Sequence, residues 1–90
     1  MDYLNELILF PDESIVNVST RDLRAFIALS EQKNFTRAAE QCFLSQSAFS
    51  AQIRALEEEL GVQLFTRSTR RVELTAEGQV FAESARRLLR

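Results

Sequence analysis

Hydrophobic residues in the first half of the chain recur at the three- and four-residue spacing of α-helices, in two consecutive runs. The first run begins near Ser19 and Thr20, either of which can cap a helix, and ends at Lys33-Asn34. The second begins after Asn34 and repeats at i, i+3, i+4, i+7 and i+8, which predicts a buried face made of Phe35, Ala38, Ala39, Cys42 and Phe43. Two small alanines at the centre of that face would let another helix approach closely. We therefore expect two short helices in tight contact.

A third run predicts a longer helix with two different ends. Ser45 can cap its start and Gly61 can stop it in a left-handed conformation. The face opposite the apolar positions carries Gln46, Ser47, Ser50 and Arg54, while Glu57-Glu58-Glu59 lies in the far half. Short uncharged groups that can hydrogen-bond thus gather at the positive end of the helix dipole. Such an end is suited to enter the major groove of DNA.

Residues 64–74 predict a small β-hairpin with a basic tip. Val72 and Leu74 alternate with polar residues, as a half-buried strand requires. The tip carries Arg67, Arg70 and Arg71 with no acidic residue among them. Thr75 would cap a last helix, whose pattern continues to the end without a stop signal. That helix is expected either to pack on a second copy or to continue in a longer protein.

The first 18 residues give a weaker pattern. Leu4, Leu7, Ile8 and Phe10 could form a turn or two of amphipathic helix before Pro11, which disfavours helix at the preceding residue. We expect a weakly structured arm over residues 1–18. An arm that packs on a partner subunit is the alternative.

Composition excludes more functions than it indicates. The chain has no histidine and one cysteine, Cys42, which argues against imidazole metal sites, histidine-based catalysis and a disulfide framework. No Gly-rich phosphate loop, signal peptide or membrane-spanning run is present in the sequence. We expect a cytoplasmic protein that is not an enzyme and binds no metal. The formal net charge of −2 disfavours binding driven by charge alone, although residues 32–90 carry nine Lys and Arg against seven Glu.

From Leu23 to Leu89 the sequence resembles the N-terminal domain of LysR-type transcriptional regulators. The blocks that carry the resemblance occur in the family's order: LRAF at 23–26, NFTRAA at 34–39, LSQSAFS at 44–50, QIRALEEELGVQLFTR at 52–67 and LTAEG at 74–78. Two positions depart from the family pattern. Ser47 stands where the family usually has proline, and Ala51 stands where arginine is common.

The resemblance implies a mainly α fold: a winged helix-turn-helix of three helices and a short β-hairpin wing, followed by a long linker helix that pairs two subunits. The implied division is an arm at 1–18, the DNA-binding domain at 19–74 and the start of the linker helix at 75–90. A C-terminal effector domain, which would bind a small-molecule inducer, is absent from this sequence. The implied partners are double-stranded DNA with a dyad-containing site and further copies of the chain, as a homodimer or, at full length, a tetramer. No cofactor is implied for residues 1–90, and no membrane partner.

Two sets of candidate residues follow. The candidates for DNA contact are Thr36, Arg37, Ser45, Gln46, Ser47, Ser50, Gln52, Arg54, Arg67, Arg70 and Arg71. The candidates for dimerisation are Val80, Phe81, Ala85, Leu88 and Leu89, which could instead cover the domain's own core. Gln46 could bind an adenine edge through two hydrogen bonds.

For three residues the sequence leaves more than one role open. Arg54 could reach the DNA backbone or pair with Glu58 one turn away. Arg67 could contact phosphate or brace the wing against the acidic end of the third helix. Cys42 is expected to pack in the core, with redox sensing as the less favoured alternative.

The leading functional hypothesis is sequence-specific binding of double-stranded DNA. Helix 46–60 would enter the major groove, and wing 66–71 would contact the backbone or the minor groove. The alternative is a winged-helix protein-interaction module without DNA affinity. The net charge and the missing arginine at Ala51 favour it weakly.

Overall fold

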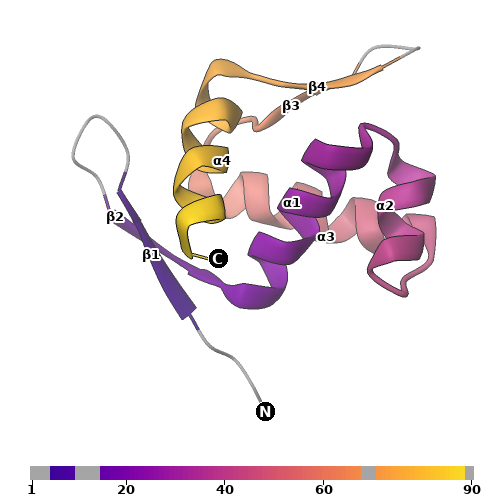
Figure 1. Cartoon of the computed structure of the whole chain (residues 1–90), viewed down its shortest axis with the longest axis horizontal. Coiled ribbons are helices and arrows are strands. Elements are labelled where there is room, and N and C mark those ends of the chain that lie inside the picture. The colour runs from indigo at the N-terminus through magenta and orange to yellow at the C-terminus, as the bar shows by residue number, and fades with distance from the viewer. Residues whose placement is uncertain (1–4, 10–14, 68–70, 89–90) are drawn as a thin grey trace.

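Four helices and two β-hairpins make up the computed structural model, which describes residues 5–9, 15–67 and 71–88 (Figure 1). In chain order the elements are β1 (Asn5–Leu9), β2 (Ile15–Ser19), α1 (Thr20–Gln32), α2 (Phe35–Gln41), α3 (Gln46–Leu60), β3 (Phe65–Arg67), β4 (Val72–Leu74) and α4 (Ala76–Leu88). The three helices and the hairpin expected between positions 19 and 74 are all present. The mainly α prediction is confirmed.

Each helix begins at a side chain that accepts a hydrogen bond from the first turn. Ser19 Oγ accepts from the amide of Asp22 at 3.1 Å, and Ser45 Oγ accepts from the amide of Ala48 at 3.2 Å. Asn34 Oδ1 and Thr75 Oγ1 cap α2 and α4 in the same way, both at 2.9 Å. Such caps contribute about 1 kcal/mol each. The expected caps at Ser45 and Thr75 are therefore confirmed.

Aromatic packing joins α1, β3 and α4 into one core. The centre of the Phe26 ring lies 5.3 Å from the centre of the Phe65 ring and 4.7 Å from that of the Phe81 ring. The rings of Phe26 and Phe81 meet edge to face. All three side chains are buried. On the other side of the domain Ala38 and Ala39 are buried, as their spacing predicted, and α2 packs against both α1 and α3.

One expectation on a buried face is wrong, and two candidates for dimerisation lie in the core. Phe43 was placed on the inner face of α2, but α2 ends before it and its side chain is 94% exposed. The turn that follows gives Phe43 a positive φ of 58°, which directs it outward. Phe81 and Ala85 were candidates either for a dimer seam or for the domain's own core, and both are fully buried because α4 folds back across α1. They cover the domain's own core.

The N-terminal region is more ordered than its sequence indicated. β1 and β2 form an antiparallel hairpin in which Asn5 lies opposite Ser19 and Leu9 lies opposite Ile15. β1 lies beside α4, and β2 runs into α1 without a linker (Figure 1). Three of the four residues at 15–18 are β-branched, a composition that favours a strand. Residues 5–9 thus form a strand and not the helical turns that were considered for the segment before Pro11.

At Gly78, α4 packs directly against the backbone of Leu64. Replacing this glycine tests how much the close contact contributes to stability. A Cβ on Gly78 would overlap the carbonyl oxygen of Leu64. Gly78→Ala is expected to lower the free energy of unfolding by about 2–3 kcal/mol, because rigid backbone must shift. Gly61→Ala is the control: it meets open space but keeps φ at +74°, so it should cost about 1 kcal/mol. Urea denaturation measures both, and equal losses would contradict the contact.

Candidate nucleic-acid interface

The first turn of α3 presents a polar, accessible surface. Gln46 and Ser47 are exposed, and Ser50 is half-buried one turn further along. Ser45 is occupied as the helix cap, and its hydroxyl lies 3.4 Å from that of Ser47. Free amide groups and the helix dipole make this end attractive to negatively charged groups. The structure therefore presents these four predicted residues together.

A hydrogen bond between two helices orients the amide of Gln46. Thr36 Oγ1, in the first turn of α2, donates to Gln46 Oε1 at 3.0 Å. Gln46 keeps one acceptor position on Oε1 and both hydrogens on Nε2. Arg37 follows Thr36 and is exposed. The start of α2 and the start of α3 therefore form one continuous polar surface.

Gln52 and Arg54 lie in different surroundings, although both were predicted to bind DNA. Gln52 is half-buried, and its Nε2 donates to Asp22 Oδ1 at 2.9 Å, which ties α3 to α1. Its amide is thus engaged inside the domain. Arg54 is exposed and forms no ion pair with any residue in the described ranges, so the pairing with Glu58 does not occur.

Glu57 holds the wing against α3. Its Oε2 accepts hydrogen bonds from the backbone amides of Leu64 at 2.8 Å and Phe65 at 3.1 Å. Its Oε1 accepts from Arg67 Nη2 at 2.9 Å, and the guanidinium of Arg67 lies 5.7 Å from the centre of the Phe35 ring. Arg67 therefore braces the wing, one of the two roles left open for it. Charge-assisted bonds of this kind are stronger than neutral ones.

Sequence reasoning did not single out Glu57, because it treated the three consecutive glutamates together as the acidic end of the helix. Glu57 is 8% exposed, whereas Glu58 and Glu59 are exposed. The available signal was helical spacing: Glu57 lies four residues after Ile53 and beside Leu56, both on the buried stripe.

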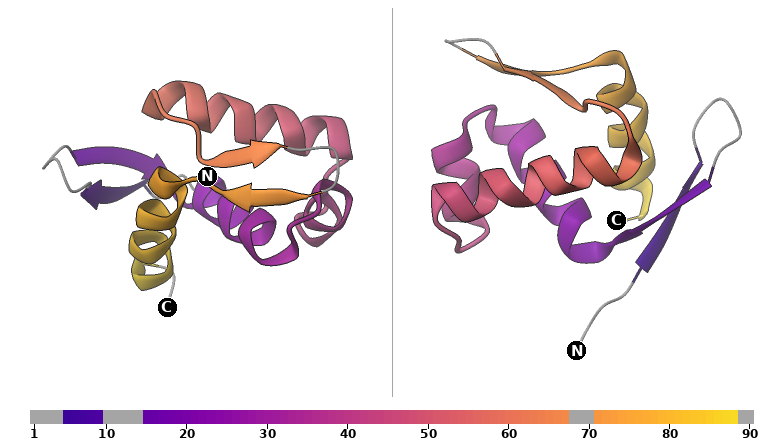
Figure 2. Two further views of the ribbon diagram at one scale, coloured as in Figure 1. Left: turned by 90° about the horizontal axis from the view of Figure 1, so that it is seen from above. Right: turned by 180° about the vertical axis from the view of Figure 1, so that it is seen from behind.

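The wing reaches toward the same end of the domain as the start of α3 (Figure 2). Arg71 is exposed, and its Nε lies 3.4 Å from Glu73 Oε2. Exposed ion pairs of this kind contribute little to stability. Arg70 falls outside the described residues. The contact of Arg67 with Phe35 and the bond of Thr36 to Gln46 link wing, α2 and α3 into one surface.

Cys42 is half-buried at the end of α2. Burial raises the pKa of the Cys42 thiol above its ordinary value, which reduces the thiolate fraction at neutral pH. This environment favours the packing role over redox sensing. Among the described residues no group of three His, Cys, Asp or Glu could hold a metal ion. No described helix has the length and apolar composition needed to cross a membrane.

Part of the dimerisation set can be placed. Val80 is half-buried, while Phe81 and Ala85 lie in the core. The side chain of Leu88, and Leu89 as a whole, lie outside the described residues.

Comparison with known proteins gives consistent matches. A family profile described as bacterial regulatory helix-turn-helix protein, lysR family, matches residues 20–79. The chain is 54% identical over 69 residues to the HTH-type transcriptional regulator ClcR of Pseudomonas putida, covering 77% of the chain and 24% of ClcR. It is 47% identical over 73 residues to the hydrogen peroxide-inducible genes activator of Pectobacterium carotovorum, covering 81% and 24%. The chain thus spans about a quarter of the length of these curated relatives.

A solved structure matches a similar part of the chain. The BenM DNA-binding domain, in complex with benA site 1 DNA, superposes with a TM-score of 0.75 at 46% identity. The match covers 78% of this chain and 79% of that one. At this identity the likeness extends beyond fold to sequence.

The wing brace generates a stability prediction with a matched control. Glu57→Gln removes the charge that binds two backbone amides and a guanidinium, so it should lower the free energy of unfolding by about 1.5–3 kcal/mol. Glu58→Gln changes an exposed neighbour and should stay within about 0.5 kcal/mol of the wild type. Urea unfolding followed by circular dichroism measures both. Similar stabilities of the two variants would show that the brace contributes nothing.

Proposed function

Because this chain belongs to the LysR family of bacterial regulatory helix-turn-helix proteins, we propose that it binds double-stranded DNA sequence-specifically, as the DNA-binding domain of a transcription regulator. The observation that carries the proposal is the exposed first turn of α3, where Gln46 is oriented by Thr36 and flanked by a braced wing. The 46% identity to a domain solved on DNA supports it.

The first turn of α3 would supply the base contacts. With its amide oriented, Gln46 presents one acceptor and two donors, and adenine offers the matching donor and acceptor in the major groove. Ser47, which is exposed, and Ser50, which is half-buried, lie one turn apart and can donate to bases or phosphates. Arg54, free of any ion pair among the described residues, would reach the backbone one turn further on.

The flanking elements would supply backbone contacts. Arg37 lies in the first turn of α2, the position from which the first helix of this motif contacts phosphates, while the hydroxyl of Thr36 is engaged with Gln46. On the wing, Arg70 and Arg71 would contact the phosphate backbone or the minor groove of the DNA. Arg67 would contribute indirectly, because its bond to Glu57 holds the wing against α3.

Self-association would extend this domain into a dimer that spans a DNA dyad. In the division proposed here residues 1–18 precede the DNA-binding domain at 19–74, and α4 begins a linker helix at 75–90. Phe81 and Ala85 are committed to the core, so a partner must contact other positions of α4 or residues beyond it. Since the chain spans about a quarter of its curated relatives, tetramer formation and inducer binding belong to a longer protein. Such a regulator would work in the bacterial cytoplasm, beside the chromosome.

The alternative, a protein-interaction module without DNA affinity, is not favoured by the similarity to domains solved on DNA, and sequence selection tests it directly. The purified chain is incubated with randomised DNA duplexes at two salt concentrations, and bound duplexes are sequenced. We expect one enriched motif whose affinity, by fluorescence anisotropy, exceeds that for a scrambled duplex and falls with salt. Equal retention of all sequences, or of none, at both salt concentrations would exclude a specific reader.

The Thr36–Gln46 hydrogen bond generates a prediction on specificity. Thr36→Val removes the hydroxyl while keeping the shape, so the amide of Gln46 is no longer held in one orientation. Discrimination for adenine at the position Gln46 reads should fall by about 3- to 10-fold, a part of what a bidentate contact provides. Affinity for a scrambled duplex should stay within twofold.

Thr36→Ser is the matched control, because it keeps the donor and should retain the wild-type base preference. A Thr36→Val motif identical to that of the wild type would show that the bond has no part in readout, and the proposed function would still stand.

A further inference from the structure

Phe43 combines two unfavourable features. Its side chain is 94% exposed, the one large hydrophobic side chain so exposed among the described residues. Its φ of 58° lies in the left-handed region, which disfavours bulky residues and which Gly or Asn adopts more readily. Neither feature helps the fold. An exposed aromatic ring in a disfavoured conformation points to contact with something outside the domain.

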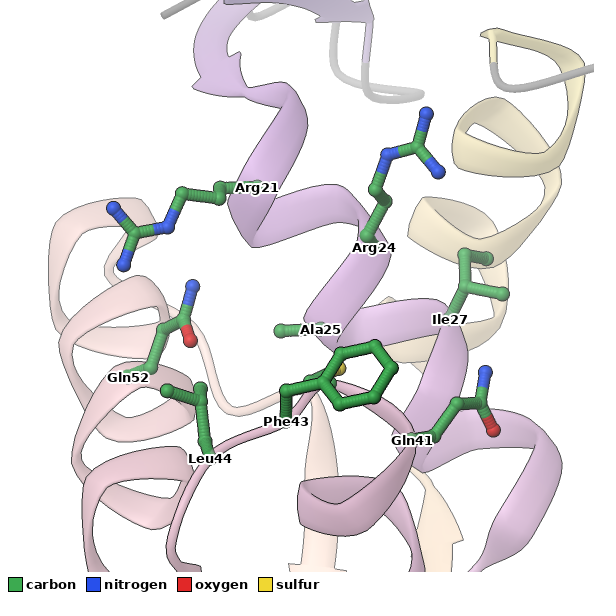
Figure 3. A pocket seen from close by; sticks show the side chains of 9 residues that line it. Arg21, Arg24, Ala25, Ile27, Gln41, Phe43, Leu44 and Gln52 are labelled. Atoms are coloured by element: carbon green, nitrogen blue, oxygen red, sulfur yellow. The ribbon is translucent and has the colours of Figure 1, made fainter. Parts of the chain in front are cut away.

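The ring of Phe43 stands at an apolar groove between α1, the α2–α3 turn and α3 (Figure 3). The groove has a volume of about 450 Å³. Apolar side chains of Ala25, Ile27, Cys42 and Leu44 contribute to its walls. Its dimensions suit one large aromatic or aliphatic side chain with part of a peptide backbone.

Two cations flank the groove. Arg21 and Arg24 project from successive turns of α1 on either side of it (Figure 3). Neither forms an ion pair or hydrogen bond within the ranges that the structure describes. The nine residues that line the groove include no carboxylate. Its electrostatic complement is therefore an acidic segment.

We propose that this groove is a docking site for a segment of another protein that presents an aromatic or aliphatic side chain flanked by carboxylates. Phe43 packs on the apolar side chain of the partner, and Arg21 and Arg24 bind the neighbouring carboxylates. Of the lining residues, Gln52 alone belongs to the predicted DNA-contact set, and its amide is already bonded to Asp22. The groove thus stays available while Gln46 and the wing contact DNA.

A random dodecapeptide phage library panned against the purified chain tests the proposal. We expect enrichment of peptides that carry Asp or Glu beside Phe, Trp, Leu or Ile. The most enriched peptide, made synthetically and labelled with fluorescein, should bind Phe43→Asn and Arg24→Glu at least tenfold more weakly than the wild type. Arg86→Glu, which makes the same charge change on the exposed face of α4, should bind it within twofold.

Phe43→Asn also separates docking from folding, because asparagine suits the left-handed turn. Its free energy of unfolding should equal or exceed that of the wild type. A clear loss of stability would assign Phe43 a structural role and overturn the proposal. Three further outcomes would also overturn it: no enrichment above the Phe43→Asn background, enrichment of basic peptides, or release of the peptide by an excess of duplex DNA. The last would place the peptide on the DNA-contact surface. Self-association of the chain that Phe43→Asn abolishes would make a second copy the occupant instead.

Discussion

One buried carboxylate sets the relation between the wing and the recognition helix. Glu57 takes no part in the exposed surface, yet it receives hydrogen bonds from two backbone amides at the start of the wing and from Arg67 near its tip. A three-residue strand pair has few bonds of its own and is marginal in isolation. Since one side chain on α3 fixes the wing at two points, the two surfaces that would face DNA behave as a rigid unit. The contact of Arg67 with Phe35 extends this unit to α2.

Local signals predicted most of the fold. Helical periodicity and capping residues located α1, α2 and α3, and alternation of apolar and polar residues located the β3–β4 hairpin. These features depend on neighbouring residues in the chain. Periodicity alone does not locate the end of a helix or the segment that packs on it. Phe43 fits the spacing of α2, but the helix ends before it. Phe81, left open between a dimer seam and the core, lies in the core because α4 packs on α1. The β1–β2 hairpin escaped notice because its two strands satisfy each other's backbone and give no helical pattern.

The candidate site shows the same division. The polar start of α3 follows from residue type and position, and exposure of Gln46, Ser47 and Arg54 agrees with it. Partners across the fold could not be derived from the sequence alone. Thr36 with Gln46, Gln52 with Asp22, and Glu57 with Arg67 are ten to thirty residues apart. Although the formal net charge is −2, Arg37 and Arg54 are exposed beside this polar surface, and local charge matters more for DNA binding than the total.

The close contact at Gly78 has a consequence for the distance between the two half-sites that a dimer would bind. Because α4 lies against the Leu64 carbonyl with no room for a side chain, the direction in which this helix leaves the domain is fixed at that glycine. A helix of 13 residues is about 20 Å long, so a tilt of about 10° at its start displaces its far end by about 3.5 Å. That displacement is close to the rise of about 3.4 Å between successive base pairs. In a dimer joined through this helix, one missing methyl group would thus set the spacing of half-sites to within a single base pair.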